Sequence, residues 1–241
     1  RAIQKHGTRG LRIGMSARTV KKTLANMKNV DVSVIEELWH GITPPYEDLF
    51  AWIDGKAEMP DISEVLTYSP VMLSHPLDEA VDLERLSPDT HNAEWKWDGI
   101  RVQVAGMKGE ARIYSRTGDD ISHSFPDLAA TVNWDAGIDV ELLVRPFGQI
   151  GSFNDLQQRL GKKTPSSALM TRLPAHLIAY DIIAQDGVSF RDKTLDERRE
   201  SLAKFITDRN PDHYSLSETL DWTTVAALAA LREDAAASEG L

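Results

Sequence analysis

Cysteine is absent from this 241-residue sequence. Its absence excludes a disulfide framework, a cysteine-based zinc site and a catalytic thiol. The sequence also lacks an uninterrupted apolar run of membrane-spanning length and a recognisable signal peptide. From these absences we expect a cytoplasmic protein that is not bound to a membrane.

Positive charge is scarce as well, since 27 lysines and arginines stand against 37 aspartates and glutamates, a formal net charge of −10. A protein that coats nucleic acid indiscriminately needs cations to neutralise phosphates, so this balance argues against that class. Local basic patches are still allowed, and residues 1–28 form one. With 41% hydrophobic residues the chain can build a core, and its length allows one large domain or two modest ones.

Residues 1–66 show the periodicity of a small helical unit. Ser16 occupies the position of an N-cap, and a second helix is predicted to start at Ser33 with a capping box. A third helix is predicted from near Thr43, with two prolines in its first turn, to Gly55. The apolar stripe of the first helix consists of Val20, Leu24 and Met27. From periodicity alone, this unit is best interpreted as a plain helical cap on the next domain.

The most informative stretch is residues 94–101, which has the spacing K-x-D-G-x-R and is followed by an apolar strand pattern. Lys96 would be a useful nucleophile if its surroundings lowered its pKa from the usual value of about 10.4. Gly99 removes a Cβ where a ligand or another backbone comes close. Asp98 adds an acceptor and Arg101 a cationic fork, a combination that suits phosphate chemistry.

Trp95 and Trp97 flank this lysine. In an extended segment their side chains would point to the face opposite Lys96, so we expect them to pack the strand more than to cover the amine. Taken alone, the stretch could equally be a solvent-facing strand edge whose charges keep the protein soluble.

Further strands carry polar residues in apolar company. A hairpin is predicted over residues 102–115 and leads into Arg116, which by itself would be a surface charge at a strand end. Asp139 and Glu141 are two residues apart in an apolar strand, so their side chains lie on the same face. Because like charges so close together repel each other, we expect a cation, a metal or sugar hydroxyls between them. The alternative there is an edge strand with one wet face. Residues 176–183 predict another buried strand, whose Tyr180 precedes an aspartate that is either a satisfied core acid or a ligand.

Taken in order, these segments resemble the motifs of the ATP-dependent DNA ligases, which are covalent nucleotidyltransferases like the RNA ligases and the mRNA capping enzymes. The matching segments are residues 94–101 (motif I), 115–116 (Ia), 139–141 (III), Tyr180 (IIIa) and 239–241 (IV). The residue between the two carboxylates of motif III is usually small in the family, and here it is Val140.

The resemblance implies an α+β fold, in which an adenylation domain of antiparallel sheets flanked by helices follows a small all-α segment. The expected domains are residues 1–66, the last part of a helical DNA-binding domain; 67–80, a linker and the entry to the core; and 81–241, the adenylation domain, truncated at motif IV. A chain of this extent is expected to lack the motif V lysines and the oligonucleotide-binding domain, and to be poor at the first step of ligation.

The resemblance also implies the chemistry. Lys96 would attack the α-phosphate of ATP and form a phosphoramidate with AMP while pyrophosphate leaves. Glu94 would accept a hydrogen bond from the adenine amino group, Tyr180 would stack on the adenine ring, and Glu141 would hold the ribose. Mg²⁺ is expected near Glu239 and Glu141.

The remaining residues of motifs I and Ia are expected beside the nucleotide and the DNA. Trp95, Arg101 and Arg116 would line the nucleotide pocket. The ends of the nick would be contacted by Asp98, Arg101 and Arg116. The expected catalytic residues are Lys96, Asp98 and Arg101.

Nicked double-stranded DNA is the expected partner of a monomeric protein. Arg9 and Arg12 lie in a glycine-punctuated basic loop, residues 7–14, which resembles a loop in the helical DNA-binding domain of many such ligases. Backbone amides and arginines on such a loop suit phosphate contacts, and Arg116 is expected to add another. Two alternatives stay open: the same chemistry on RNA or on a cap, and a non-catalytic nick-binding module that keeps the fold.

Overall fold

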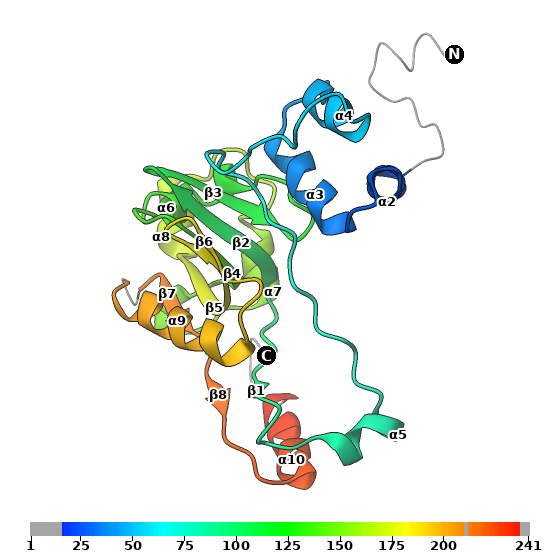
Figure 1. The fold of residues 1–241 in the computed structure, drawn as a ribbon. Helices are drawn as coiled ribbons and strands as arrows, with labels where there is room; N and C mark the ends of the chain where they lie inside the picture. Colours follow the sequence, from blue (N-terminus) through cyan, green and yellow to red (C-terminus); the bar gives the residue numbers. More distant parts are fainter. Residues whose placement is uncertain (1–15, 210–211, 237–241) are drawn as a thin grey trace, which may run out of the picture. The chain divides into compact units, whose positions relative to one another are not determined.

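The structure is a computed structural model that describes residues 16–209 and 212–236. The chain divides into two compact units, residues 1–70 and 71–241 (Figure 1). Residues 67–80, which were predicted to be a linker, are therefore shared between the two units. Among the described residues, no helix is both long and apolar enough to cross a membrane.

The first unit contains three described helices: α2 (Ala17–Lys28), α3 (Val32–Gly41) and α4 (Glu47–Ile53). The predicted cap of the first helix is confirmed, because the Ser16 hydroxyl accepts a 3.1 Å hydrogen bond from the Thr19 N–H. Leu24 is buried in the small core, but Met27 is 64% exposed, so the predicted apolar stripe ends one turn early.

The predicted starts of the other two helices were wrong. α3 starts earlier than Ser33, because the Asp31 side chain caps it and accepts a 2.8 Å hydrogen bond from the Ser33 N–H. α4 starts only at Glu47, after both prolines. The residue before a proline is pushed out of the helical region, and two consecutive prolines therefore delay the helix beyond Thr43.

The second unit is built on a six-stranded sheet with the order β3-β2-β4-β5-β6, in which β7 also pairs with β5. The strands are β2 (Ile100–Met107), β3 (Glu110–Ser115), β4 (Ala136–Val144), β5 (Ala175–Gln185), β6 (Val188–Ser189) and β7 (Tyr214–Leu216). All pairs are antiparallel except β5 with β7. The predicted hairpin is confirmed, and β4 lies in the middle of the sheet, which excludes the edge-strand alternative.

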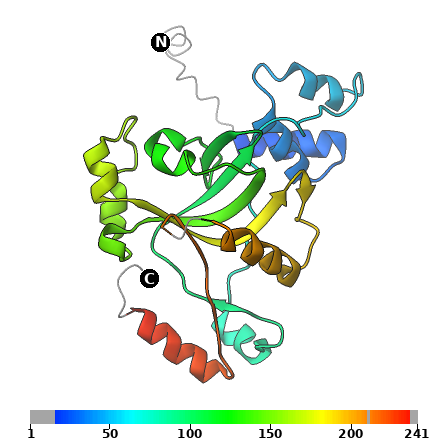
Figure 2. The same cartoon turned by 90° about the vertical axis from the view of Figure 1, so that its left-hand side faces the viewer.

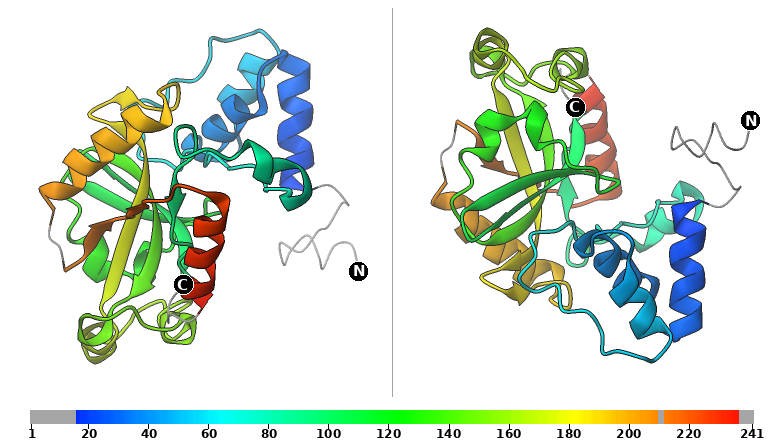
Figure 3. Two further views of the ribbon diagram at one scale, coloured as in Figure 1. Left: turned by 90° about the horizontal axis from the view of Figure 1, so that it is seen from below. Right: turned by 90° about the horizontal axis from the view of Figure 1, so that it is seen from above.

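The described helices of this unit are mostly short, and only α9 and α10 are longer. They are α5 (Glu79–Asp82), η1 (Leu83–Arg85), η2 (Ser122–Ser124), α6 (Pro126–Ala129), η3 (Pro146–Gly148), α7 (Phe153–Gln157), α8 (Ser167–Arg172), α9 (Leu195–Thr207) and α10 (Val225–Ala236). Figures 2 and 3 show α7 and α8, in yellow-green, on a different side of the sheet from α9, in orange. Two further strands, β1 (Ala93–Glu94) and β8 (Thr219–Leu220), pair only with each other. β1 leads directly to Lys96.

The two faces of the central strand β4 differ in character. Ile138, Val140 and Leu142 are fully buried in the apolar core. Residues that face each other in an antiparallel pair share a face of the sheet, and Glu141 faces Arg101 while Asp139 faces Gln103. The predicted placement of the two carboxylates on one face is thus confirmed, and this face carries the polar residues.

A buried histidine makes the stability of the second unit depend on pH. The side chain of His176 is 2% exposed, with Nδ1 3.0 Å from the Asp212 carbonyl oxygen and Nε2 2.9 Å from the Ser215 hydroxyl. Burial lowers the pKa of His176, so below about pH 6.5 the unfolded chain binds more protons than the folded one. We expect the free energy of unfolding to fall as pH drops through this range, and His176→Gln to weaken that dependence.

Urea denaturation at a series of pH values from 7 to about 5 measures the effect. His123→Gln, which removes an exposed histidine, is the matched control. Parallel curves for the wild type and His176→Gln would show that this histidine does not cause the pH dependence.

Candidate active site

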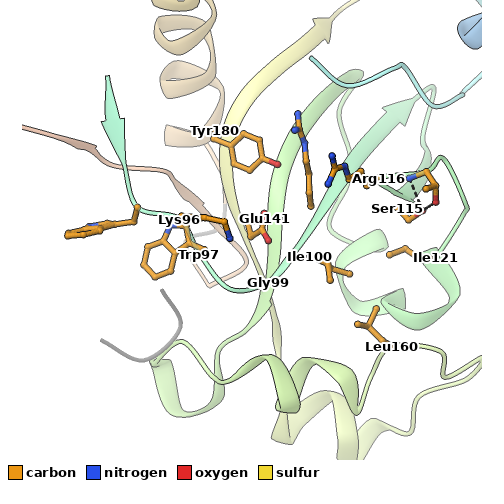
Figure 4. A pocket seen from close by; sticks show the side chains of 13 residues that line it. Lys96, Trp97, Gly99, Ile100, Ser115, Arg116, Ile121, Glu141, Leu160 and Tyr180 are labelled. Carbon is orange, nitrogen blue, oxygen red and sulfur yellow. Dashed lines mark hydrogen bonds between the residues drawn. The ribbon is translucent and has the colours of Figure 1, made fainter. Parts of the chain in front are cut away.

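The polar face of the sheet carries a pocket of about 600 Å³ (Figure 4). Its walls come from the residues before and at the start of β2, the turn after β3, the middle of β4 and β5, and the segment after α7. The lining residues are Trp95, Lys96, Trp97, Gly99, Ile100, Arg101, Ser115, Arg116, Thr117, Ile121, Glu141, Leu160 and Tyr180. The fold therefore brings six of the predicted site residues to one pocket: Trp95, Lys96, Arg101, Arg116, Glu141 and Tyr180.

Residues 95–99 form an irregular loop between β1 and β2. Because side chains alternate between faces only in an extended strand, this loop can direct consecutive side chains to the same side. Trp95, Lys96 and Trp97 all line the pocket, so the tryptophans contribute to its wall. Lys96 is exposed, and Figure 4 shows its amine directed toward Glu141.

Gly99 fixes the end of this loop against the sheet. A Cβ at this position would lie 2.5 Å from the Leu142 carbonyl oxygen and 3.0 Å from Cγ of Glu141. The predicted close approach at Gly99 is confirmed, and its partner is the backbone of β4. Any larger residue would push the Lys96 loop away from β4.

Glu141 is the carboxylate at the centre of the pocket. Burial raises the pKa of Glu141 to about 7, and the charge on Lys96, a hydrogen bond from the Gly99 backbone and the charge on Arg101 oppose this rise. The same carboxylate thus interacts with the lysine, the glycine and the arginine of the K-x-D-G-x-R stretch.

Arg101 is held in place by Asp139, which is 1% exposed. The Nε atom of Arg101 donates to both carboxylate oxygens of Asp139, at 3.1 and 3.2 Å. A second guanidinium nitrogen donates to Asp139 and, at 2.8 Å, to the Met72 carbonyl oxygen. Arg101 is therefore the cation that the two carboxylates were expected to require. Because Asp139 fixes the guanidinium of Arg101, this side chain forms part of the pocket wall.

Tyr180 closes the pocket from β5. Its hydroxyl donates a 3.2 Å hydrogen bond to Asp139, and the Arg101 guanidinium carbon lies 5.6 Å from the centre of its ring. Burial raises the pKa of Tyr180, so the phenol stays protonated. The neighbouring Asp181 receives two hydrogen bonds from Arg198, at 2.8 and 3.2 Å, and is thus a satisfied acid.

The other predicted site residues lie elsewhere. Asp98 is exposed and does not line the pocket. The Glu94 carboxylate also lies outside the lining and pairs with Arg199 at 3.4 Å. Arg9, Arg12 and Glu239 fall outside the described residues, so the structure places none of them.

Arg199 was not among the predicted site residues. Besides Glu94, it donates to the backbone oxygens of Tyr180 and Ser217 and to the Thr219 hydroxyl, at 3.3, 2.6 and 3.1 Å. It joins α9 to β5, to β8 and to the strand that precedes Lys96. The sequence signal that could have pointed to Arg199 is the pair of adjacent arginines, Arg198 and Arg199, in the amphipathic helix α9.

The sheet, its covering helices and a pocket that combines a lysine, a carboxylate, a fixed guanidinium group and an aromatic ring define a nucleotidyltransferase-like domain. Residues 71–241 match the family described as "ATP dependent DNA ligase domain". The chain therefore belongs to the ATP-dependent DNA ligase family, as its motifs predicted.

Its relatives are DNA ligases. The chain is 35% identical over 121 residues to a probable DNA ligase of Koribacter versatilis, covering 49% of this chain and 21% of that one. It is 26% identical over 214 residues to a DNA ligase of Methanocaldococcus jannaschii, covering 83% and 36%. The chain thus spans about a fifth to about a third of the length of these two curated relatives.

Solved structures share the fold. The ligase domain of LigD from M. tuberculosis aligns with a TM-score of 0.50 at 24% identity, over 63% of this chain and 47% of that one. A mycobacterial DNA ligase D complexed with ATP and MES aligns with a TM-score of 0.50 at 23% identity, over 62% and 46%. These likenesses confirm the predicted α+β class.

Proposed function

We propose that this chain carries the adenylation centre of a ligase that seals nicks in double-stranded DNA at the expense of ATP. The observation that supports this most is the position of Lys96, whose amine lies in one pocket with Glu141, Arg101 and Tyr180 although these residues come from three separate strands or loops. Figure 4 shows the amine and the Glu141 carboxylate side by side.

In the proposed first step, the neutral Lys96 amine attacks the α-phosphorus of ATP. A phosphorus–nitrogen bond forms, the bond to the bridging oxygen of pyrophosphate breaks, and the amine loses a proton. Arg101 and Arg116 would hold phosphate oxygens from the pocket wall. Because Asp139 already fixes the Arg101 guanidinium, little side-chain freedom is lost when phosphate binds.

The nucleoside would be held by the opposite side of the pocket. Tyr180 presents an aromatic ring for stacking on the base, and Glu141 can accept hydrogen bonds from ribose hydroxyls. Trp95 adds apolar surface to the lining. Glu94 is the proposed acceptor for the adenine amino group, and to act so it would share its carboxylate with Arg199.

In the later steps, AMP would pass to the 5′-phosphate of the nick, and the 3′-hydroxyl would displace it as the phosphodiester bond forms. Asp98, Arg101 and Arg116 are the proposed contacts with the nick ends. Arg9 and Arg12 are proposed to bind the duplex by phosphate contacts that read no sequence.

The donor set fits Mg²⁺. Glu141 offers one half-buried carboxylate beside the place proposed for the phosphates, and Mg²⁺ is commonly held by one or two carboxylates together with substrate phosphates. Within residues 16–209 and 212–236, no group of three histidine, aspartate or glutamate side chains could hold a metal alone. We propose Glu141 and Glu239 as its protein ligands. When bound, the ion would offset negative charge on the transferring phosphate.

Intact-mass measurement tests the proposal. The protein is first freed of bound AMP with pyrophosphate, and then incubated with ATP and Mg²⁺. We expect an acid-labile increase of one AMP in the wild type and none in Lys96→Arg, which keeps the charge but removes the nucleophile. GTP should give no adduct. AMP-free protein that binds ATP but never forms the adduct would contradict the proposal, and so would an unchanged adduct in Lys96→Arg.

A further inference from the structure

A second concave surface shares the segment after α7 with the Lys96 pocket. It encloses about 510 Å³ between α7 and α8, and its lining includes Gln158, Lys162, Ser166, Leu169 and Arg172. We call this surface, together with the exposed Lys163, the α7–α8 shelf. Figure 2 shows α7 and α8 together at one side of the unit.

The shelf is basic in an acidic protein. Between Leu142 and Tyr180 the sequence holds five arginines and lysines but a single acidic residue, Asp155, whereas acidic residues outnumber basic ones by 37 to 27 in the whole chain. Arg159, one of the five, is buried and paired with Asp127. Lys162, Lys163 and Arg172 are exposed, and none of them forms an ion pair within the part of the chain that the structure describes.

The backbone beneath these cations is firmly held. Arg159 donates to the carbonyl oxygens of Ser124, at 3.1 Å, and Leu173, at 3.2 Å, which ties the end of α8 to the segment after α7. The Ser124 hydroxyl donates a 3.0 Å hydrogen bond to the Lys162 carbonyl oxygen. Arg172 donates to the Gln158 side chain at 2.9 Å. The shelf is thus a preformed surface.

Its position links it to the proposed chemistry. Leu160 lines the Lys96 pocket, while Gln158 and Lys162, two residues to either side, line the shelf. The segment after α7 therefore contributes to both surfaces.

We propose that the α7–α8 shelf binds the sugar–phosphate backbone of duplex DNA beside the nick. This inference rests on the proposed function, because that function places a nick at the Lys96 pocket. Flexible cations suit a chain of evenly spaced phosphates. An interface with a protein partner would instead have an apolar centre, and lysine is depleted at protein–protein interfaces. The contact carries no sequence information, because cations on phosphates position a protein without reading bases.

The test compares two triple variants with the same change in net charge. Lys162→Gln/Lys163→Gln/Arg172→Gln removes the shelf cations, and Lys108→Gln/Lys193→Gln/Lys204→Gln removes exposed cations elsewhere. Binding of nicked duplex DNA is measured over a range of salt concentrations, and AMP adduct formation is measured in parallel. We expect the shelf variant to lower the slope of log K against log salt by up to about 3, near one for each lost phosphate contact. The control should change it much less.

The outcomes separate this inference from the proposed function. Equal slopes for the two variants would overturn the shelf proposal, whatever happens to adduct formation. Binding of polyglutamate by the shelf variant is the second readout. If the shelf variant lost as much affinity for polyglutamate as for nicked DNA, the proposal would be overturned, because the shelf would then fit an acidic protein equally well. A lower slope with a normal AMP adduct supports both proposals. A lower slope in a protein that forms no adduct even as wild type would support the shelf and count against the proposed function.

Discussion

Arg159→Leu is expected to lower the free energy of unfolding of the second unit by about 3 to 5 kcal/mol, the usual cost of removing one partner of a buried ion pair. The Arg159 side chain is 0% exposed and donates to both oxygens of Asp127, at 2.9 and 2.5 Å. Its guanidinium carbon also lies 4.7 Å from the centre of the Phe125 ring. Leucine fills part of the space but leaves the Asp127 carboxylate and two carbonyl oxygens without their donor.

Urea denaturation of Arg159→Leu, Asp127→Asn and the double variant measures this loss and the coupling between the two residues. Arg112→Leu is the control, because the Arg112 side chain is 43% exposed and its ion pairs, at 3.3 and 3.7 Å, should contribute about 1 kcal/mol or less. A loss for Arg159→Leu as small as that of the control would show that the buried pair does not hold α7 and α8 together.

Arg159 also shows what the sequence could and could not reveal. The strands were predictable, because β4 and β5 are long apolar runs and the β2–β3 turn has the glycine that its left-handed backbone requires: φ is 51° at Lys108 and 80° at Gly109. An arginine just after a short helix, however, looks like a surface residue. Its burial depends on Asp127, 32 positions away, and no local pattern encodes that pairing.

The same limit applies to the pocket. The K-x-D-G-x-R spacing singled out Lys96 as a candidate and predicted the close approach at Gly99. It could not show that Arg101 pairs with Asp139, 38 positions later, because the register between β2 and β4 decides which side chains meet. The two-residue strand β1 was also beyond prediction, since so short an element leaves no periodic signal.

This short strand makes the position of Lys96 depend on Arg199. β1 pairs with β8 through only two residue pairs, and an isolated two-stranded ladder is marginally stable at best in water. Arg199, whose side chain is 12% exposed, donates to Glu94 of β1, to Thr219 of β8 and to the Tyr180 backbone of the main sheet. Its guanidinium is therefore the polar link that sets the Lys96 loop against the Tyr180 wall.

Arg199→Gln is accordingly expected to slow formation of the AMP adduct on Lys96 by about 100-fold, because a displacement of about 1 Å costs that much when the reacting groups must be aligned. Arg199→Lys keeps the charge but not the fork that reaches several acceptors, so it should recover only part of the rate.

The matched control for this prediction is Arg198→Gln. It removes the neighbouring arginine of α9, whose side chain is 13% exposed and whose ion pair with Asp181 has no link to β1 or β8. Both glutamine variants should lose similar free energies of unfolding, as urea denaturation can measure, but only Arg199→Gln should lose most of the adenylation rate. If adduct formation fell equally in both variants, in proportion to stability, Arg199 would support the fold without positioning Lys96.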